Sequence, residues 1–505
     1  MRLSFLIIII FSISCLGFSQ QVHKGSVIKD RQFLIDKKEL TASDSLGNFV
    51  SIRPHTINGT LRNYFVELYE NLDFTNRIEI ETKGDTDILK TFLYNGKSYV
   101  FLKEKNGKTI SLILNSIDIK TKKISSQLLY SVSKEEDSSI FKALKNNFFI
   151  DLDIASEITL SFPVLNNKVN HVIVKIFSKD LQLKSTFTIS PNASKSYKNI
   201  KFLTTMRFDD KIYTLFQVNN SEDDNFYELI KTSNNKTQSL KIQIPSKSYE
   251  LINSKIKNNH FIISGIFSNV KKGGYKGFTY YNIDLNTFTL NSSKQSLFQN
   301  KKAETYFSGF FKDNRSIDIK DIFINDALET YIVGQFYIKK RQSLPVGMPI
   351  ASFSFSGFAG YITINPISTS YKVFDDLLIG KIKANGSLEW DNLLQLRQTE
   401  KITSKSNKRD SSTFTFFANE QINILINGFI EEKKGRLFVK QDKRPNKTNF
   451  YNITVNPYGG ISQNIIFSNA NSETIFRAEN SIKSNNIIHI LGQGNMRKQL
   501  LMLKF

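Results

Sequence analysis

Cysteine is almost absent from this chain of 505 residues, and the only one is Cys15. A single cysteine excludes an intramolecular disulfide and every metal site built from several thiolates. Histidine is also scarce, and no two of the five histidines are close enough in sequence to form a metal-binding pair on one helix. We therefore expect no metal site, no cofactor and no thiol chemistry.

The chain also lacks the short motifs of common enzyme classes. It contains no G-x-S-x-G nucleophile elbow, no Walker-type phosphate loop and no G-x-G-x-x-G dinucleotide motif. The S-x-D-x-G-x-x-W boxes of sialidases are missing too, and a single tryptophan excludes the repeated tryptophan docking of quinoproteins. No residue is therefore assigned a catalytic role.

The N-terminus has the three-part layout of a secretory signal. A positively charged start precedes an almost uninterrupted apolar run over residues 3–13, and small residues precede a predicted cut after Ser19. The run is too short to span a bilayer, and no other stretch is long and apolar enough to do so. We expect residues 1–19 to be removed and the protein to work in the periplasm or outside the cell. The less favoured alternative is a lipid anchor on Cys15, because Ser12 stands where a lipoprotein signal normally has leucine.

Positive charge exceeds negative charge by a wide margin. The chain has 68 Lys and Arg against 46 Asp and Glu, which gives a net charge of +22. Such an excess attracts polyanions such as acidic glycans. The basic residues are spread along the chain rather than grouped in blocks, which favours a generally basic composition without a specific polyanionic partner. Nucleic acid is not an expected partner.

Short apolar runs rich in Ile, Val, Phe, Tyr and Thr recur from about residue 30 to the C-terminus. Amphipathic helical periodicity is almost absent, so the pattern predicts an all-β chain of many short strands. The strands group in fours: residues 88–130 contain four such runs, and residues 199–244 repeat the scheme. The same pattern fits residues 40–82, 140–189, 249–297, 316–397 and 411–467.

The four strands of a unit differ in a regular way. Fourth strands alternate between apolar and polar residues, as Leu240, Ile242 and Ile244 do, which is typical of an outer, half-exposed strand. Third strands are apolar on both faces, which is typical of strands packed between neighbouring sheets. This gradient predicts a β-propeller of four-stranded blades rather than a sandwich. Second strands of the later units end in an apolar-x-Gly pattern, at Gly265, Gly334, Gly428 and Gly492.

The two ends of the chain predict how the ring closes. After residue 473 only three strands remain, over 474–478, 486–491 and 499–505, and one strand over 27–37 precedes the first full unit. Three plus one strands complete a blade if the N- and C-terminal strands pair, which leaves no open gap. We therefore predict a single propeller domain over residues 20–505 with eight blades. Seven is the alternative, because the unit 140–189 is the least regular. His489 lies in an apolar run of the last blade, so we expect a satisfied core or inter-blade histidine rather than a metal ligand.

The segment Asp44-Ser45-Leu46-Gly47-Asn48-Phe49-Val50 resembles the D-x-x-G-N-apolar-apolar opening of the repeats of secreted bacterial β-propeller proteins. The glycine endings at Gly265, Gly334 and Gly492 are similar to the ending of the same repeat. The resemblance covers most of the chain in pattern but only a few units in residues. It implies a binding or scaffolding module, and the repeat type has no catalytic residues to carry over.

One segment breaks the repeat, between the second and third strands of the sixth unit. Residues of roughly 341–373 form an insertion in which aromatic residues are spaced by Ser, Gly and Ala. Long connections in compact folds often carry function, so the candidate binding residues are Phe353, Phe355, Phe358 and Tyr361. The alternative, weighed equally, is a hairpin that covers an apolar blade surface. A second insertion, 431–446, is basic and is expected to be a solvated hairpin tip.

These observations predict a non-catalytic, exported, monomeric β-propeller that binds or scaffolds, with a protein or a glycan as its partner. Two alternatives stay open. One is a propeller-fold glycan hydrolase or lyase whose active site is built from face loops, and the other is a polyanion-binding surface protein. Converging buried acids on one face would favour the enzyme, an uncharged aromatic patch the binding protein, and clustered basic residues the polyanion-binding protein.

Overall fold

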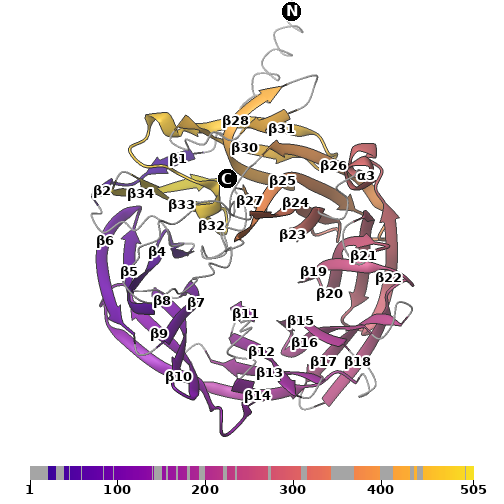
Figure 1. Ribbon diagram of the computed structural model, residues 1–505, viewed down its shortest axis with the longest axis horizontal. Helices are drawn as coiled ribbons and strands as arrows, with labels where there is room; N and C mark the ends of the chain where they lie inside the picture. The colour runs from indigo at the N-terminus through magenta and orange to yellow at the C-terminus, as the bar shows by residue number, and fades with distance from the viewer. Residues whose placement is uncertain are drawn as a thin grey trace, which may run out of the picture.

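The computed structural model of the chain is a closed ring of antiparallel β-sheets (Figure 1). In each sheet the first strand lies nearest the centre of the ring and the last strand lies at its rim. The structure describes residues 21–29, 39–44, 46–57, 60–82, 85–94, 96–138, 140–141, 151–154, 157–166, 169–178, 182–192, 199–219, 224–233, 236–270, 274–308, 315–342, 369–397, 413–432, 437–440, 447–494 and 496–505.

Eight four-stranded blades make up the ring, so the predicted eight-bladed propeller is confirmed. Blade 1 consists of β3 (Leu40–Ser43), β4 (Phe49–Ile57), β5 (Thr60–Glu70) and β6 (Asp73–Glu81), and blade 2 of β7 (Asp85–Tyr94), β8 (Lys97–Asn106), β9 (Thr109–Asp118) and β10 (Ile124–Ser133). Blade 3 consists of β11 (Asp151–Ile154), β12 (Ile158–Asn166), β13 (Val169–Phe177) and β14 (Leu183–Ile189), and blade 4 of β15 (Asn199–Phe208), β16 (Lys211–Asn219), β17 (Asn225–Ser233) and β18 (Lys236–Gln243). Blade 5 consists of β19 (Tyr249–Lys257), β20 (His260–Ser268), β21 (Tyr275–Asp284) and β22 (Thr289–Leu297), and blade 6 of β23 (Arg315–Ile324), β24 (Thr330–Gln342), β25 (Thr369–Ile382) and β26 (Leu388–Arg397). Blade 7 consists of β27 (Thr413–Ala418), β28 (Gln421–Glu432), β30 (Asn449–Val455) and β31 (Ile461–Ser468), and blade 8 of β32 (Ser481–Ser484), β33 (Ile487–Gly494), β34 (Arg497–Lys504) and β1 (Gln21–Lys24). The helix α3 (Lys301–Ser308) and the 3-10 turns η3 (Asn469–Asn471) and η4 (Ala478–Asn480) lie in connections between blades.

Burial follows the order of the strands. The third strand β21 is buried along almost its whole length, whereas the fourth strand β22 is largely exposed. Third strands lie between two neighbouring blades and therefore bury both faces, and apolar clusters fill these spaces. Between blades 4 and 5, for example, Tyr213 and Tyr227 pack with Phe261 and Tyr281. The predicted burial gradient is therefore confirmed.

The ring closes by pairing of the two chain ends, but the N-terminal strand is not the one predicted. β1 pairs with Leu501–Lys504 of β34, and only the two residues of β2 (Ile28–Lys29) pair with Arg497 and Lys498. The rest of the predicted strand 27–37 lies outside the described residues. Gly25 joins β1 and β2 and donates its N–H to Leu500 O. A Cβ at Gly25 would lie 2.1 Å from Leu72 O, so only glycine fits this close approach.

The innermost strand of blade 8 is also later in the sequence than predicted. β32 takes this place, whereas Ile475 forms only an isolated bridge with Gln493. Phe476 and Ala478 are fully buried against the cluster between blades 7 and 8. Their apolar character therefore reflects packing rather than a strand.

The basic insertion 431–446 is not simply a solvated hairpin tip. Residues 431–432 extend β28, and β29 (Leu437–Lys440) pairs antiparallel with β28 of blade 7 and parallel with β26 of blade 6. This extra strand joins the two blades into one continuous sheet. The pairing was not predictable from periodicity, because a strand of four residues gives little periodic signal.

The connections between strands divide the ring into two unlike faces. On one face, turns join the first to the second strand of each blade and the third to the fourth strand of blades 1 to 7, and none of them exceeds five residues between the described strands. We call this the short-turn face. On the other face, connections join the second to the third strand and each blade to the next, and they include 134–150, 298–314, 343–368 and 398–412. We call this the long-connection face.

Candidate functional site

The candidate aromatic residues of the long insertion, Phe353, Phe355, Phe358 and Tyr361, lie outside the described residues. The strands that flank the insertion are described. β24 and β25 pair as far as Gln342 and Thr369, which are cross-strand partners. The insertion therefore lies between the second and third strands of blade 6, as predicted, and both its ends meet on the long-connection face.

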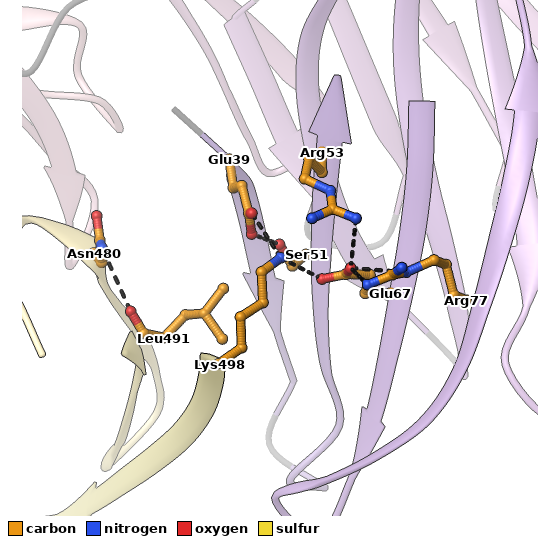
Figure 2. A network of polar contacts seen from close by, with 8 residues as sticks. All are labelled: Glu39, Ser51, Arg53, Glu67, Arg77, Asn480, Leu491 and Lys498. Atoms are coloured by element: carbon orange, nitrogen blue, oxygen red, sulfur yellow. Dashed lines mark hydrogen bonds and ion pairs between the residues drawn. The ribbon is translucent and has the colours of Figure 1, made fainter. Parts of the chain in front are cut away.

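Among the described residues, a network of buried charged side chains lies at the seam between blades 8 and 1 (Figure 2). Lys498 on β34 is 1% exposed, and its Nζ lies 2.7 Å from a carboxylate oxygen of Glu39 and 2.7 Å from one of Glu67. Arg77 Nη2 lies 2.7 Å from Glu67 Oε1, and Arg53 Nη2 lies 3.5 Å from the same oxygen. Three cations and two carboxylates therefore meet in this seam.

Figure 2 also shows why this network does not act as an acid pair open to substrate. Glu39 and Glu67 converge, but the ammonium group of Lys498 lies between them and is almost inaccessible to solvent. The partners come from opposite ends of the chain and meet only when the ring closes. No motif marks them in the sequence, so sequence reasoning missed them. We therefore assign this network to closure of the ring.

A second buried acid lies between blades 4 and 5. Glu250, at the start of β19, accepts hydrogen bonds from Tyr227 Oη (2.9 Å), Thr279 Oγ1 (2.8 Å), Tyr281 Oη (2.8 Å) and Gln295 Nε2 (2.8 Å). Burial raises the pKa of this carboxyl, and the hydrogen bonds oppose that rise. All these donors are neutral, so Glu250 is held by hydrogen bonds rather than by an ion pair.

Gly265, one of the repeated glycines of the sequence, explains how β19 packs here. A Cβ at this position of β20 would lie 1.9 Å from Leu251 O, the carbonyl that follows Glu250. The absence of a side chain therefore lets β19 approach β20 closely.

His489 is buried between blades 8 and 1, as predicted, but its ring is not satisfied. The side chain is 0% exposed and packs against Phe49, with 5.8 Å between the ring centroids. Neither ring nitrogen has a hydrogen-bond partner. The expectation of a satisfied histidine is therefore wrong, and each unpaired buried polar group costs about 1–3 kcal/mol. Burial lowers the pKa of His489 to about 4, so the ring is neutral at neutral pH.

No protein-family model matches this chain, and no curated protein matches it. Solved structures that resemble it include the WD40 domain of SCAP from fission yeast, with a TM-score of 0.41, 8% identity, and coverage of 97% of this chain and 99% of that chain. Polysaccharide lyase Uly1 has a TM-score of 0.42 and 11% identity, with coverage of 94% of this chain and 99% of that chain. The β-propeller domain of the Trilobed protease from Pyrococcus furiosus has a TM-score of 0.35 and 10% identity, with coverage of 85% of this chain and 96% of that chain. At these TM-scores the likenesses carry no argument about function, and the fold rests on the strand pairing described above.

Three lysines of blades 5 and 6 near the short-turn face are paired with acids, although the whole chain is strongly basic. The ion pairs join Lys255 to Asp321 at 2.7 Å, Lys257 to Asp326 at 2.7 Å, and Lys381 to Glu329 at 3.1 Å and to Glu389 at 3.0 Å. These described pairs do not favour a polyanion-binding surface at this position.

No three His, Cys, Asp or Glu side chains within the described ranges lie close enough together to hold a metal ion. In the same part of the chain, no helix is long and apolar enough to cross a membrane.

Proposed function

We propose that this chain is an exported, non-catalytic β-propeller that binds or scaffolds a protein or a glycan through its long-connection face. The observation that carries the proposal is the asymmetry of the ring. Every connection longer than five residues between the described strands belongs to this face, while the opposite face has only short turns. Binding residues are usually borne by loops on a rigid scaffold, and here the scaffold is a closed ring.

The buried acids support a binding protein over a glycan hydrolase or lyase. A carboxylate that acts on a substrate must be reachable by it. Glu67 is 1% exposed and paired with cations, and Glu250 is surrounded by protein donors. Neither acid therefore fits the role of a general acid or base.

A binding screen with product detection tests this proposal. The purified mature protein is applied to an array of glycans, and any bound glycan is then incubated with the protein and analysed for cleavage. We expect binding without products. Release of shortened or unsaturated products would replace the proposal with the hydrolase or lyase, and binding that salt abolishes for every acidic glycan alike would replace it with the polyanion-binding protein.

Substitution of the insertion tests where the partner binds. The double change Phe355→Ala and Phe358→Ala is expected to abolish binding while the Tm stays within a few degrees. Tyr458→Ala is the matched control, because Tyr458 is 87% exposed on a turn of the short-turn face. If the phenylalanines instead cover a blade, the double variant should lose several kcal/mol of stability, and that loss would contradict a binding role for this loop.

Export is tested by the mass of the mature protein. Secretion from a bacterial host should yield a chain that begins at or within a few residues of Gln20 and carries no lipid. A lipid-modified Cys15 would contradict this part of the proposal.

A further inference from the structure

Three side chains that can bind metal ions lie in one row across blade 8. On adjacent strands, His489 of β33 is the cross-strand partner of Met502 of β34, and Met502 is the partner of His23 of β1. Directly paired residues of antiparallel strands project to the same side of the sheet. The three side chains therefore share one face of the blade. This face packs toward blade 1, because Met502 contacts the cluster that contains Phe49 and Tyr69.

The spacing of the row suits a single ion. Neighbouring strands lie about 4.8 Å apart, so the Cα atoms of the two histidines are about 10 Å apart with Met502 midway between them. Imidazoles that lean inward from both sides can each place a nitrogen about 2 Å from an ion that lies above the methionine sulfur.

The three side chains of the row differ in burial, from a fully buried histidine at one end to an exposed histidine at the other. His489 is fully buried, and neither of its nitrogens has a hydrogen-bond partner. Met502 is half-buried and His23 is exposed at the rim of the ring. A buried nitrogen without a hydrogen-bond partner is energetically unfavourable. A metal ion that enters past His23 and binds to a nitrogen of His489 would satisfy it.

We propose that His23, Met502 and His489 bind one soft transition-metal ion, and that this ion is copper in the cuprous state. Thioether sulfur selects Cu(I) among the metals that proteins bind, and imidazole is also a ligand for copper. All three ligands are neutral, so the bound metal ion keeps its full charge in an apolar seam. Because burial of charge is costly, a monovalent ion suits this set of ligands better than a divalent one. The site goes beyond the proposed binding function and does not depend on it.

The test is a titration of the purified mature protein with Cu(I) under nitrogen, in competition with a colorimetric Cu(I) chelator. We expect one equivalent of Cu(I) to bind, and saturation to raise the Tm, because the unfolded chain does not bring the three ligands together. X-ray absorption of the loaded protein should show sulfur as well as nitrogen neighbours of copper.

Three variants and two controls make the titration specific. Met502→Leu keeps the side-chain volume and removes the sulfur, so it should lower the Cu(I) affinity at least tenfold and remove the sulfur signal. His23→Gln changes an exposed residue and should also weaken binding without affecting folding. His489→Phe should abolish binding. Met496→Leu and His171→Gln change the same residue types elsewhere and should bind Cu(I) like the wild type.

The proposal fails if the wild-type protein binds no stoichiometric Cu(I). It also fails if the Met502→Leu and His23→Gln variants, folded as judged by circular dichroism, bind Cu(I) as tightly as the wild type. These two variants decide the matter even if His489→Phe does not fold. The copper ligands lie in blade 8, whereas the tested partner-binding residues lie in the insertion of blade 6, so loss of copper binding should leave partner binding unchanged and the two proposals are tested separately.

Discussion

At the level of single residues, the seams between blades differ in how they hold buried polar groups. The seam between blades 8 and 1 pairs Glu67 with Lys498 and Arg77, whereas the seam between blades 4 and 5 surrounds Glu250 with hydroxyl and amide donors. Ion pairs favour the charged form of a buried acid, while burial without a cation favours its neutral form. The two seams are therefore expected to respond differently to substitution.

Lys498→Met should destabilise the whole protein, because it leaves Glu39 and Glu67 buried without their shared cation. Removal of one partner of a buried ion pair costs about 3–5 kcal/mol. The measurement is the free energy of unfolding in urea, followed by circular dichroism. Lys108→Met is the control, since Lys108 and Glu135 form a surface pair with side chains 71% and 74% exposed, and should leave stability unchanged. Equal stability of the two variants would contradict a closing role for the network.

Glu250→Gln should change how stability depends on pH. The folded protein raises the pKa of Glu250 above the ordinary value of a glutamate, so between these two values the folded state keeps a proton that the unfolded state has lost. Stability therefore falls as the pH rises through this window, and glutamine removes that fall. We expect the Tm of the variant, relative to the wild type, to increase from pH 4 upward. Glu304→Gln, at an exposed glutamate of α3, should run parallel to the wild type. A parallel profile for Glu250→Gln would rule out the raised pKa.

At the level of elements, tight turns set the register of the strands. Three turns between first and second strands consist of two residues that both have positive φ: Asp209 and Asp210 (51° and 55°), Asn258 and Asn259 (47° and 61°), and Asn419 and Glu420 (52° and 57°). This geometry matches the twist of paired antiparallel strands. The D-x-x-G-N segment forms a longer turn between the first and second strands of blade 1, where Asp44 Oδ1 accepts the N–H groups of Leu46 and Asn48 and Gly47 has φ of 89°.

Gly265→Ala tests whether a repeated glycine is needed for close strand approach rather than for its φ. The added Cβ would lie 1.9 Å from Leu251 O, so β19 must move away from β20, and a loss of several kcal/mol is expected because the surrounding core is close-packed. Gly107→Ala is the comparison. Gly107 has φ of 57° and nothing within 4 Å of the new Cβ, so the cost should be only about 1–2 kcal/mol. Thermal unfolding measures both, and similar losses would contradict the steric explanation.

At the level of the whole molecule, stability depends on a closure made by residues from both ends of the chain. β34 pairs with β33 on one side and with β1 and β2 on the other. Its apolar residues Leu500, Leu501 and Leu503 are fully buried against both neighbouring blades. Closure therefore combines backbone pairing with two apolar clusters and the network around Lys498.

Deletion of residues 500–505 should destabilise the entire ring. The deletion exposes the edges of β33 and β1 and removes three fully buried leucines. We expect a large drop in Tm and binding of a hydrophobic dye, both measured on the truncated protein. Deletion of residues 20–24 removes only the outer strand of blade 8 and should cost less. A truncated protein that melts like the full chain would contradict closure by this strand.

The sequence by itself determined the all-β class, the four-strand blades and their number, because strand periodicity, turn residues and the burial gradient are local properties that repeat every blade. It also placed the long insertion between two specific strands. Only the tertiary structure decided that β1 rather than 27–37 provides most of the closing pair, that β29 joins blades 6 and 7, and that Lys498 lies between Glu39 and Glu67. The alignment of His23, Met502 and His489 in one row was likewise decided only by the tertiary structure. None of these contacts has a local signal, because each joins segments that are distant along the chain: about 43 positions for β29 and β26, and hundreds of positions for the partners at the closing seam.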